Sequence, residues 1–363
     1  MAQSTVVTPA QPAQQNETLY RRMLKEIVES KANPDLCHTL FPPQVVIEST
    51  AACNQSCTFC GRTYLERQKG HMPRPIFNRI VDEIARESPL TEILPAYMGE
   101  ALLLGDELFV RMATARRLGC KKITLNTNGT LVEKYAARLC DGDIDRVSIS
   151  CDAHSQRTHQ LVRPSKKGGG LEAVYRGVHA LLDERAKRSQ KRPFIEVGFT
   201  VFDETEHEVE EFVEHWSKYD VVVKTRPKGF HAGTVPGGDF RKSMGAERTP
   251  CGWLVDTMTV LWNGNVVLCA ADVDARFLAG NIEQQTLRQM WNGSLKWVRE
   301  LQFRGRYRDL PKICRGCTDW QSRASHTFYP SEEVKKEYLE FVRLGRMALY
   351  DSGTVQTPAF EDD

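Results

Sequence analysis

Residues 53–60 of the chain read CNQSCTFC, and they follow the apolar, strand-like stretch PQVVIEST at residues 43–50. The three cysteines, Cys53, Cys57 and Cys60, have the spacing C-x3-C-x2-C. Three thiolates this close together can hold a cubane iron–sulfur cluster and leave its fourth iron without a protein ligand. An open iron of this kind can bind a small molecule and take part in its chemistry.

A zinc site and a set of unrelated buried thiols are the two alternatives for these cysteines. Structural zinc takes four closed ligands, and the closest histidine, His71, lies eleven residues beyond Cys60. Chance burial of three cysteines in a polar run is the weakest interpretation. The spacing alone favours a cluster over zinc and leaves both open.

The composition is that of an ordinary globular protein. Hydrophobic residues make up 41% and charged residues 26% of the 363 residues, and the net charge is +2. This length suits one large α/β domain with an appendage, and the small net charge indicates no nucleic-acid or membrane partner. No apolar run approaches the roughly 18 residues of a membrane span. The N-terminal 1–18 segment is rich in Gln, Pro, Thr and Ala and is predicted to be a disordered tail, in a cytoplasmic protein.

From about residue 43 to 230, short β-branched runs alternate with longer amphipathic stretches. The expected strands are 45–48, 92–97, 122–126, 146–150, 195–201 and 221–225, and the expected helices are 76–87, 107–118, 131–139, 171–189 and 206–219. This alternation predicts an α/β fold with a parallel sheet, namely a partial (β/α)6 TIM-like barrel over residues 19–230. Because catalytic residues of such folds gather after the strands, CNQSCTFC is expected at the mouth of the barrel.

The chain changes character after the Gly- and Pro-rich segment 227–240. The run TMTVLWNGNVVLC predicts a hairpin about its Asn-Gly pair, a helix is expected over 287–303, and a charged helix over 331–349. We expect a linker at 231–250, an α+β appendage over 251–325, and a C-terminal helix and tail over 326–363. Four cysteines of this part have the spacing C-x17-C-x44-C-x2-C, which suits structural zinc and an iron–sulfur cluster equally: Cys251, Cys269, Cys314 and Cys317. The other four cysteines are expected to be core packing: Cys37, Cys120, Cys140 and Cys151.

The block around the first three cysteines resembles the radical S-adenosylmethionine (SAM) superfamily. Members share C-x3-C-x-aromatic-C at the end of the first strand, and Phe59 is the aromatic residue here. The resemblance implies that SAM completes the open iron of a [4Fe-4S] cluster, with Phe59 near its adenine. It also implies that an electron from the cluster cleaves SAM to a 5′-deoxyadenosyl radical.

Further motifs match the superfamily in chain order. YMGE at 97–100 resembles its GGE motif with methionine for the first glycine, and implies that the glutamate accepts a hydrogen bond from the SAM ammonium. NTNG at 126–129 matches its TNG element, SCD at 150–152 matches its S-x-D element, and an arginine follows where members often contact the SAM carboxylate. The SAM-binding set that the resemblance implies is Phe59, Gly99, Glu100, Asn128, Ser150, Asp152 and Arg163.

The second set of cysteines resembles the SPASM/twitch subgroup of this superfamily, as do the glycine of the hairpin and the runs LAGNI and MWN. The subgroup also has an R-x-x-G-x-M run after the cysteine loop, matched here by RQKGHM at 67–72 and implied to shape that loop. Such appendages bind auxiliary iron–sulfur clusters. Because no cysteine follows Cys317, one auxiliary [4Fe-4S] cluster on all four cysteines is implied rather than two. A fully ligated cluster suits electron transfer better than substrate binding.

The single-cluster arrangement is similar to that of dehydrogenases of the 2-deoxy-scyllo-inosamine type, which oxidise aminocyclitols in antibiotic pathways. This implies hydrogen abstraction from a small sugar, aminocyclitol or nucleoside, alcohol oxidation with the auxiliary cluster as electron acceptor, and an external electron donor such as flavodoxin or ferredoxin. The alternative is radical decarboxylation of a glucuronosyl nucleoside by a lyase, which needs a cation for the carboxylate. Arg226, with Lys224 and Lys228 near it, suits either task as the catalytic residue. Ribosomal-peptide modification is less favoured, because only about 42 residues precede the first strand.

Overall fold

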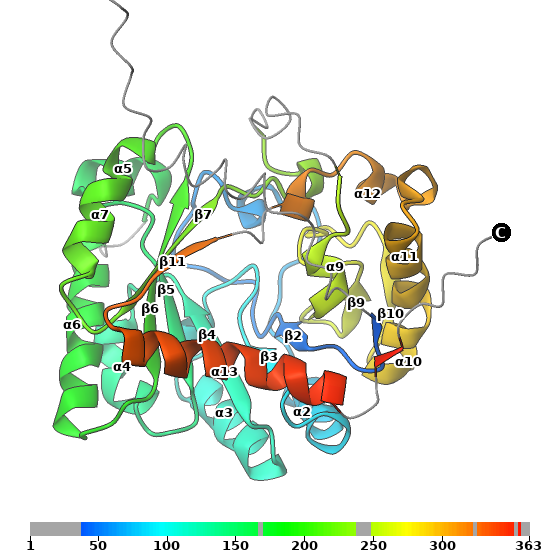
Figure 1. Cartoon of the computed structure of the whole chain (residues 1–363), viewed down its shortest axis with the longest axis horizontal. Helices are drawn as coiled ribbons and strands as arrows, with labels where there is room; N and C mark the ends of the chain where they lie inside the picture. The colour runs from blue at the N-terminus through cyan, green and yellow to red at the C-terminus, as the bar shows by residue number, and fades with distance from the viewer. Residues whose placement is uncertain (1–37, 166–169, 237–247, 322–324, 352–354, 357–363) are drawn as a thin grey trace, which may run out of the picture.

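The computed structural model describes residues 38–165, 170–236, 248–321, 325–351 and 355–356. The tail expected over residues 1–18, Cys37 and positions 237–247 of the expected linker lie outside the described residues. Within the described ranges, ten strands form one sheet in the order β10-β9-β8-β2-β3-β4-β5-β6-β7-β11 (Figure 1). Their bounds are β2 Gln44–Ile47, β3 Glu92–Leu94, β4 Lys122–Thr127, β5 Arg146–Ser150, β6 Phe194–Val201, β7 Val222–Pro227, β8 Thr257–Val260, β9 Asn265–Val267, β10 Leu278–Asn281 and β11 His326–Phe328. A separate two-stranded sheet pairs β1 (His38–Thr39) with β12 (Val355–Gln356).

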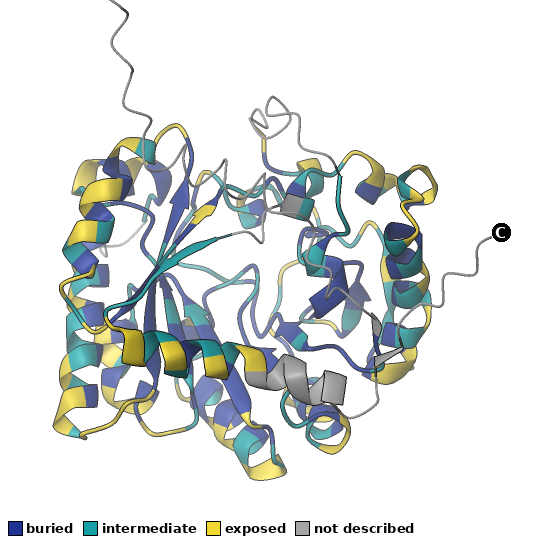
Figure 2. Cartoon of the chain, in the orientation of Figure 1, coloured by how far each residue is buried: buried dark blue, intermediate teal, exposed yellow. Residues whose placement is uncertain are grey.

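The six expected strands are confirmed as β2 to β7, all parallel. Alternation of side chains explains their burial, as β5 illustrates. Val147 and Ile149 are fully buried in the main hydrophobic core, whereas Arg146 and Ser148 on the opposite face hydrogen-bond to charged side chains of the barrel interior. Figure 2 shows the same division, with buried strands and helices that are exposed on their outer sides. The partial barrel therefore has an apolar outer layer under its helices and a polar interior.

The five expected helices of the barrel are present, and α5 is a further helix that the sequence did not predict. They are α2 Arg74–Glu87, α3 Asp106–Leu118, α4 Val132–Leu139, α5 Gln156–Val162, α6 Leu171–Lys187 and α7 Val209–Trp216. The appendage contributes α9 Gly252–Asp256, α10 Leu287–Asn292, α11 Ser294–Phe303 and α12 Lys312–Arg315, and α13 is Glu332–Asp351. Short 3-10 turns are η1 Gly61–Tyr64, η2 Ala101–Leu104, η3 Glu206–Glu208, η4 His231–Gly233, η5 Tyr307–Asp309 and η6 Asp319–Gln321. The single helix expected over 287–303 is wrong in one respect, because the chain breaks at Gly293 into α10 and α11.

The C-terminal part of the chain extends the barrel sheet at both edges. The hairpin expected from the Asn-Gly pair is confirmed as β8 and β9, and β8 also pairs in parallel with β2. At the opposite edge, β11 pairs antiparallel with β7. The appendage is thus continuous with the barrel sheet through the pairing of β8 with β2.

The lower end of the barrel, opposite the cysteine loop, is closed by α13 over a layer of buried charges. Arg146 donates to Glu92 at 2.7 Å and to the Tyr338 hydroxyl of α13 at 2.7 Å, and lies 3.6 Å from Glu196. Burial alone would raise the pKa of Glu92 and Glu196, but the cations Arg146, Lys122 and Lys224 outweigh it and hold both at about 2. Both carboxylates are therefore ionised, and together with Arg146 they form the floor of the barrel.

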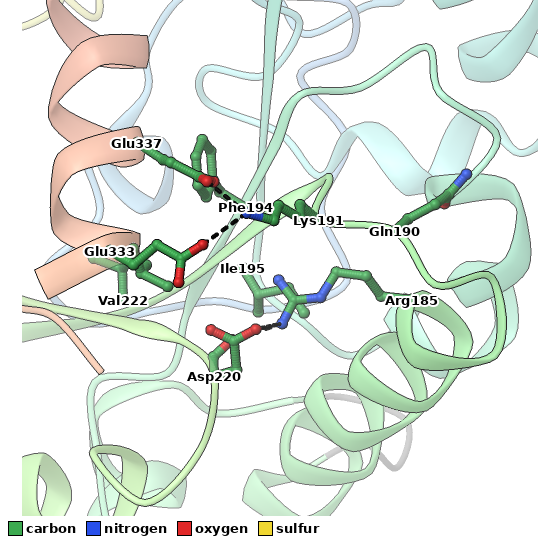
Figure 3. Close-up of a pocket in the computed structure, with 10 residues that line it drawn as sticks. Arg185, Gln190, Lys191, Phe194, Ile195, Asp220, Val222, Glu333 and Glu337 are labelled. Carbon is green, nitrogen blue, oxygen red and sulfur yellow. Dashed lines mark hydrogen bonds and ion pairs between the residues drawn. The ribbon is translucent and has the colours of Figure 1, made fainter. Parts of the chain in front are cut away.

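A hollow of about 230 Å³ lies beside this floor, between the end of α6, the starts of β6 and β7, and α13 (Figure 3). Its charged side chains pair with one another: Arg185 with Asp220 at 2.6 Å, and Lys191 with Glu333 at 2.8 Å and Glu337 at 2.7 Å. The hollow is therefore lined by side chains that already form ion pairs, and the pairs made by Lys191 join α13 to the barrel. In the part of the chain that the structure describes, no helix is long and apolar enough to cross a membrane.

Candidate active site

The loop that carries the first three cysteines follows β2 and is held by backbone hydrogen bonds. Ser56 N donates to Pro164 O and Thr58 N donates to Val162 O, each at 3.0 Å, and Glu100 N donates to Ala52 O at 2.8 Å. These bonds tie the loop to the segments after α5 and β3. The cysteine loop therefore has a fixed position at the upper end of the strands.

The three thiols of this loop are neighbours. Burial raises the pKa of Cys57 to about 12, opposed by Arg163 and reinforced by Cys60 and Cys53. Arg163 Nη1 lies 3.6 Å from Cys57 Sγ, and Asn128 Nδ2 lies 3.8 Å from Cys53 Sγ. Thiols that disfavour one another's charge, with N–H donors aimed at two of them, are the donor set that iron needs, because the metal itself deprotonates its ligands. The residues present fit a cluster here.

The predicted GGE element lies directly against the cysteine loop. A Cβ on Gly99 would lie 2.1 Å from Thr50 O and 2.7 Å from Ala52 O, so only glycine fits there. Glu100 is 2% exposed, and its carboxylate accepts from Leu102 N at 3.1 Å, Thr127 Oγ1 at 2.9 Å and Asn128 N at 2.7 Å. In this structure Glu100 joins the ends of β3 and β4, and its contact with SAM stays a prediction.

Asn128 connects the end of β4 to the cysteine loop. Its Nδ2 donates to Asn54 Oδ1 at 2.7 Å, and its Oδ1 accepts from Thr130 N at 3.1 Å. The turn that follows needs a glycine, because Gly129 has φ +81°. Asn128 is thus fixed beside Cys53, as the sequence motif suggests.

The remaining predicted SAM residues form a second cluster on the other side of the loop. Asp152 accepts from Thr200 N at 2.5 Å and from Arg163 Nε at 2.6 Å, and Arg163 also reaches Gln55 Oε1 at 3.2 Å. The Arg163 guanidinium lies 5.4 Å from the centre of the Phe59 ring. Ser150 is the last residue of β5, opposite Gly198 of β6, and is half-buried. The structure therefore brings four of the predicted residues together at the carboxyl ends of the strands: Phe59, Ser150, Asp152 and Arg163. Asp152 and Arg163 are paired to each other.

The second set of cysteines also comes together. Burial raises the pKa of Cys269 well above its usual value, and Cys251, Cys314 and Cys317 raise it further. Cys251 precedes α9, Cys269 follows β9, Cys314 lies in α12 and Cys317 follows it. Among the described residues no three His, Cys, Asp or Glu side chains are positioned around one point to hold a single ion. What the structure establishes is a buried neighbourhood of four thiols, a donor set that suits an iron–sulfur cluster.

Three contacts that the sequence did not reveal join the appendage to the barrel. Arg67 pairs with Glu48 at 2.6 Å and donates to Val273 O at 2.5 Å. The Tyr97 hydroxyl donates to Ala270 O, next to Cys269, at 2.8 Å. The RQKGHM run therefore does more than shape its loop, because its arginine bonds the barrel to the appendage.

The third contact is made by Asp319, two residues after Cys317. Its carboxylate accepts from Phe230 N and Ala232 N, each at 2.6 Å, and its own N–H lies 3.3 Å from Cys317 Sγ. The sequence showed only an aspartate two residues after Cys317, and that spacing alone does not predict the contact. The loop after β7 is thereby fastened to the second thiol set.

Arg226 lies at the end of β7, beside Thr200 of β6. Its side chain is exposed, and its Nε donates to Thr200 Oγ1 at 3.4 Å. Lys224 is on the same face of β7, with its ammonium 4.0 Å from Glu196. Lys228 turns toward Pro236 O and the rings of Phe202 and Phe230. Two cations, Lys224 and Arg226, therefore line one side of the barrel interior above its floor.

Fold and site together define an iron–sulfur protein of the partial-barrel class. The family model of the radical SAM superfamily matches residues 47–215, and that of the iron–sulfur cluster-binding SPASM domain matches residues 251–318. The chain therefore carries a radical SAM domain followed by a SPASM domain. Its radical SAM domain binds a four-iron cluster and SAM, and its SPASM domain binds auxiliary iron–sulfur clusters.

Curated relatives match only part of the chain. A probable GTP 3′,8-cyclase of Methanococcus aeolicus is 27% identical over 182 residues, which cover 49% of this chain and 56% of that protein. A probable dual-specificity RNA methyltransferase of Cytophaga hutchinsonii is 27% identical over 139 residues, which cover 35% and 38%. The chain thus spans about half the length of the cyclase that it matches, or less for the methyltransferase.

Solved structures share the fold over more of the chain. BtrN in complex with AdoMet and 2-DOIA has a TM-score of 0.54 at 16% identity, and the match covers 77% of this chain and 94% of BtrN. Native anSMEcpe with bound AdoMet has a TM-score of 0.55 at 18% identity, with 85% and 98% covered. Streptococcus suis SuiB bound to S-adenosylmethionine has a TM-score of 0.57 at 13% identity, with 78% and 72% covered. At these identities the likeness concerns the fold alone.

Proposed function

We propose that this protein oxidises a secondary alcohol of a small sugar, aminocyclitol or nucleoside to a ketone. The observation that carries the proposal is the set of hydrogen bonds by which Asp319, Tyr97 and Arg67 join the segments beside the appendage cysteines to the barrel. Alcohol oxidation must dispose of an electron after hydrogen abstraction, and a closed four-thiol site next to the barrel mouth is suited to receive it. BtrN, with its bound 2-DOIA, offers a fold of the same kind around a small polar molecule.

The residues divide into three groups in this proposal. Cys53, Cys57 and Cys60 hold the cluster that binds SAM, and the appendage cysteines hold one auxiliary four-iron cluster. When bound, these cofactors supply a hydrogen-abstracting 5′-deoxyadenosyl radical and a one-electron acceptor. The chain itself orients the two small molecules: Gly99 leaves room for close approach, Asn128 and Ser150 offer polar groups beside the cysteine loop, and Arg226 donates hydrogen bonds to a substrate oxygen.

Decarboxylation is the second candidate, and the pair of cations on β7 favours it. Lys224 and Arg226 are on one face of the strand, two residues apart. Two cations together suit a carboxylate better than they suit the ammonium of an aminocyclitol. Loss of carbon dioxide would release no net electron for the auxiliary cluster to accept. The hydrogen bonds that hold the appendage against the barrel therefore favour oxidation.

Anaerobic turnover separates the two reactions. The protein is reconstituted to about eight irons per chain, the content of two four-iron clusters, and is given SAM, dithionite, and either 2-deoxy-scyllo-inosamine or cytosylglucuronic acid deuterated at the carbinol carbons. Oxidation predicts a ketone, deuterated 5′-deoxyadenosine and no carbon dioxide. Carbon dioxide without a ketone would replace oxidation by decarboxylation. Zinc instead of iron on the appendage cysteines after anaerobic purification would remove the electron acceptor.

A further inference from the structure

The loop after β7 has an unusual backbone at His231. His231 and the following Ala232 have φ values of +48° and +51°, a region that residues with a Cβ rarely adopt. Each such residue costs on the order of 1–3 kcal/mol and persists only where surrounding contacts hold it. Backbone strain at two successive residues therefore indicates that the position of the His231 side chain has a function.

Asp319 is the contact that holds this strained loop. Its two carboxylate oxygens accept from the N–H groups on either side of His231, those of Phe230 and Ala232, at 2.6 Å each. Asp319 is 2% exposed. Arg276 supports the same loop from outside, because its guanidinium donates to Ala232 O at 3.4 Å and to Thr234 Oγ1. Both carboxylate oxygens of Asp319 thus accept hydrogen bonds from the backbone on either side of His231. Asp319 therefore fixes the position of the loop that carries the imidazole.

The His231 ring lies between the two thiol sets. A Cβ on Gly61, the residue after Cys60, would lie 3.1 Å from the ring Cγ and 3.3 Å from Cδ2, so the ring packs directly on that glycine. The same point is 3.0 Å from Val273 of the appendage. Among the described residues, neither ring nitrogen has a hydrogen-bond partner. The imidazole is therefore positioned at the mouth with an acceptor atom available.

Burial, more than the surrounding charges, lowers the pKa of His231 and keeps a ring nitrogen free to accept a proton at neutral pH. Burial lowers the pKa of His231, Asp319 opposes this, and Arg226 on β7 lowers it further. Two further cations, Arg276 and Lys228, lie against the same loop. A histidine whose pKa falls below 6.5 is neutral at pH 7 and can accept a proton.

We infer that His231 is the catalytic base that takes the hydroxyl proton of the substrate alcohol, an inference that rests on the proposed oxidation. The carbinol loses one hydrogen atom to the 5′-deoxyadenosyl radical, one proton to a His231 ring nitrogen and one electron to the auxiliary cluster, and its C–O single bond becomes C=O. Arg226 donates to the same oxygen and stabilises its negative charge as the proton leaves.

The other polar groups near the mouth are poorer proton acceptors. The guanidinium of Arg226 has no acceptor atom. Glu196 is buried, has a pKa of about 2, and is bonded to Ser148 and Tyr338. Lys224 is a rival on β7: Glu196 raises its pKa, but burial, Arg146 and Arg226 outweigh that effect and lower it. Lys224 has a carboxylate 4.0 Å away that helps it retain its charge, whereas burial and Arg226 outweigh the effect of Asp319 on His231.

The test compares His231→Gln, Lys224→Met and the control His207→Gln, whose side chain is 66% exposed, in the deuterated 2-deoxy-scyllo-inosamine assay. Loss of a general base should lower ketone formation by roughly 10²-fold or more in His231→Gln, while deuterium transfer to 5′-deoxyadenosine stays within about threefold of the wild type. A carbon-centred substrate radical should then accumulate in the electron paramagnetic resonance spectrum. His207→Gln should behave as the wild type.

Two outcomes overturn the inference alone and leave the proposed oxidation standing, and a third contradicts both. Normal ketone formation by His231→Gln removes the base role, and radical accumulation in Lys224→Met alone assigns it to Lys224. No ketone from the wild type contradicts the oxidation and the base together. A further readout needs no turnover and no folded variant: histidine-selective NMR of the metal-free wild-type protein should show a neutral His231 ring at pH 7, and a protonated ring would exclude it as the base.

Discussion

Asp319→Asn is the sharpest perturbation of the link between barrel and appendage. The substitution keeps the size of the side chain but replaces one acceptor oxygen by an NH₂ group. That group would face a backbone N–H of Phe230 or Ala232 that now bonds to a carboxylate oxygen at 2.6 Å. One buried donor is thereby left without an acceptor, and the surviving bond loses its charge.

The magnitude follows from these two changes. An unsatisfied buried donor costs about 1–3 kcal/mol, and a hydrogen bond to a charged group exceeds a neutral one by about 1 kcal/mol. The loop therefore loses roughly 3 kcal/mol of the free energy that holds it closed. The strain at His231 and Ala232 is on the order of 2–6 kcal/mol in total. Because the two quantities are similar, opening of the loop that is rare in the wild type should become populated in Asp319→Asn.

Hydrogen exchange measures this opening directly. A loss of about 3 kcal/mol corresponds to an increase of roughly 150-fold in the exchange rate of the protected amides. Those amides include Gly233 and Val235, whose N–H groups both bond to Phe230 O at 3.0 Å. Mass spectrometry of a peptide spanning residues 229–236, in the reconstituted protein, gives the rate. Ketone formation should fall with it, whereas SAM cleavage should not.

Two variants control the experiment. Asp309→Asn alters an exposed aspartate paired with Arg306 and should leave exchange in 229–236 unchanged. Adding Ala232→Gly to Asp319→Asn removes the Cβ that disfavours φ +51° and should recover about 1 kcal/mol. Exchange within about twofold of the wild type in Asp319→Asn, well short of the factor expected from 3 kcal/mol, would refute the role of Asp319 as the clamp.

Three further predictions concern the cysteines, Gly99 and the barrel floor. Replacing Cys53, Cys57 and Cys60 by Ala should abolish 5′-deoxyadenosine formation, whereas Cys314→Ala should retain part of it; equal loss in both would mean that the appendage is mainly structural. Gly99→Ala should abolish SAM cleavage, because its Cβ would lie 2.1 Å from Thr50 O, and iron content together with SAM binding would show any tolerance of the methyl group. Glu92 and Glu196 have folded pKa values of about 2 against 4.5 when unpaired, so their stabilisation is complete above pH 4.5 and is lost as the pH falls toward 2. Arg146→Met should cost about 3–5 kcal/mol at pH 7, seen as a lower denaturant midpoint, and an unchanged midpoint would contradict the floor.

The sequence predicted the barrel well because its strands carry their own signal. In β5 and β6, alternate residues are fully buried under the helices, and this period of two is visible without a structure. The pairing of β8 with β2 and of β11 with β7 could not be predicted in the same way. Residues such as Thr259 and Val46 are more than two hundred positions apart, and no local pattern records that they are partners. The break at Gly293 was missed because the apolar period continues across it.

The candidate site was predictable to the extent that its chemistry depends on spacing. The spacing of cysteines within one loop predicts that they bind a metal centre, and the short motifs after strands predict residues of the site. His231 and Asp319 show nothing of the kind, because their relationship is made by a backbone bond between segments 87 residues apart. Glu100 illustrates the opposite case: its motif is evident, yet its carboxylate is filled by donors of the protein itself.

The open iron at Cys53, Cys57 and Cys60 explains how a radical begins but not why the reaction should end in oxidation. That outcome requires the proton and the electron of the alcohol to leave in compatible directions. The loop after β7 contacts both sites. The ring of His231 packs on Gly61, next to Cys60, and the backbone of Ala232 donates to Asp319, whose own N–H lies near Cys317. In the proposed oxidation, a proton accepted on His231 would place positive charge near the appendage cluster that accepts the electron, and the Coulomb attraction in a buried site would favour both transfers together. Separation of the loop from Asp319 should therefore impair oxidation while hydrogen abstraction continues.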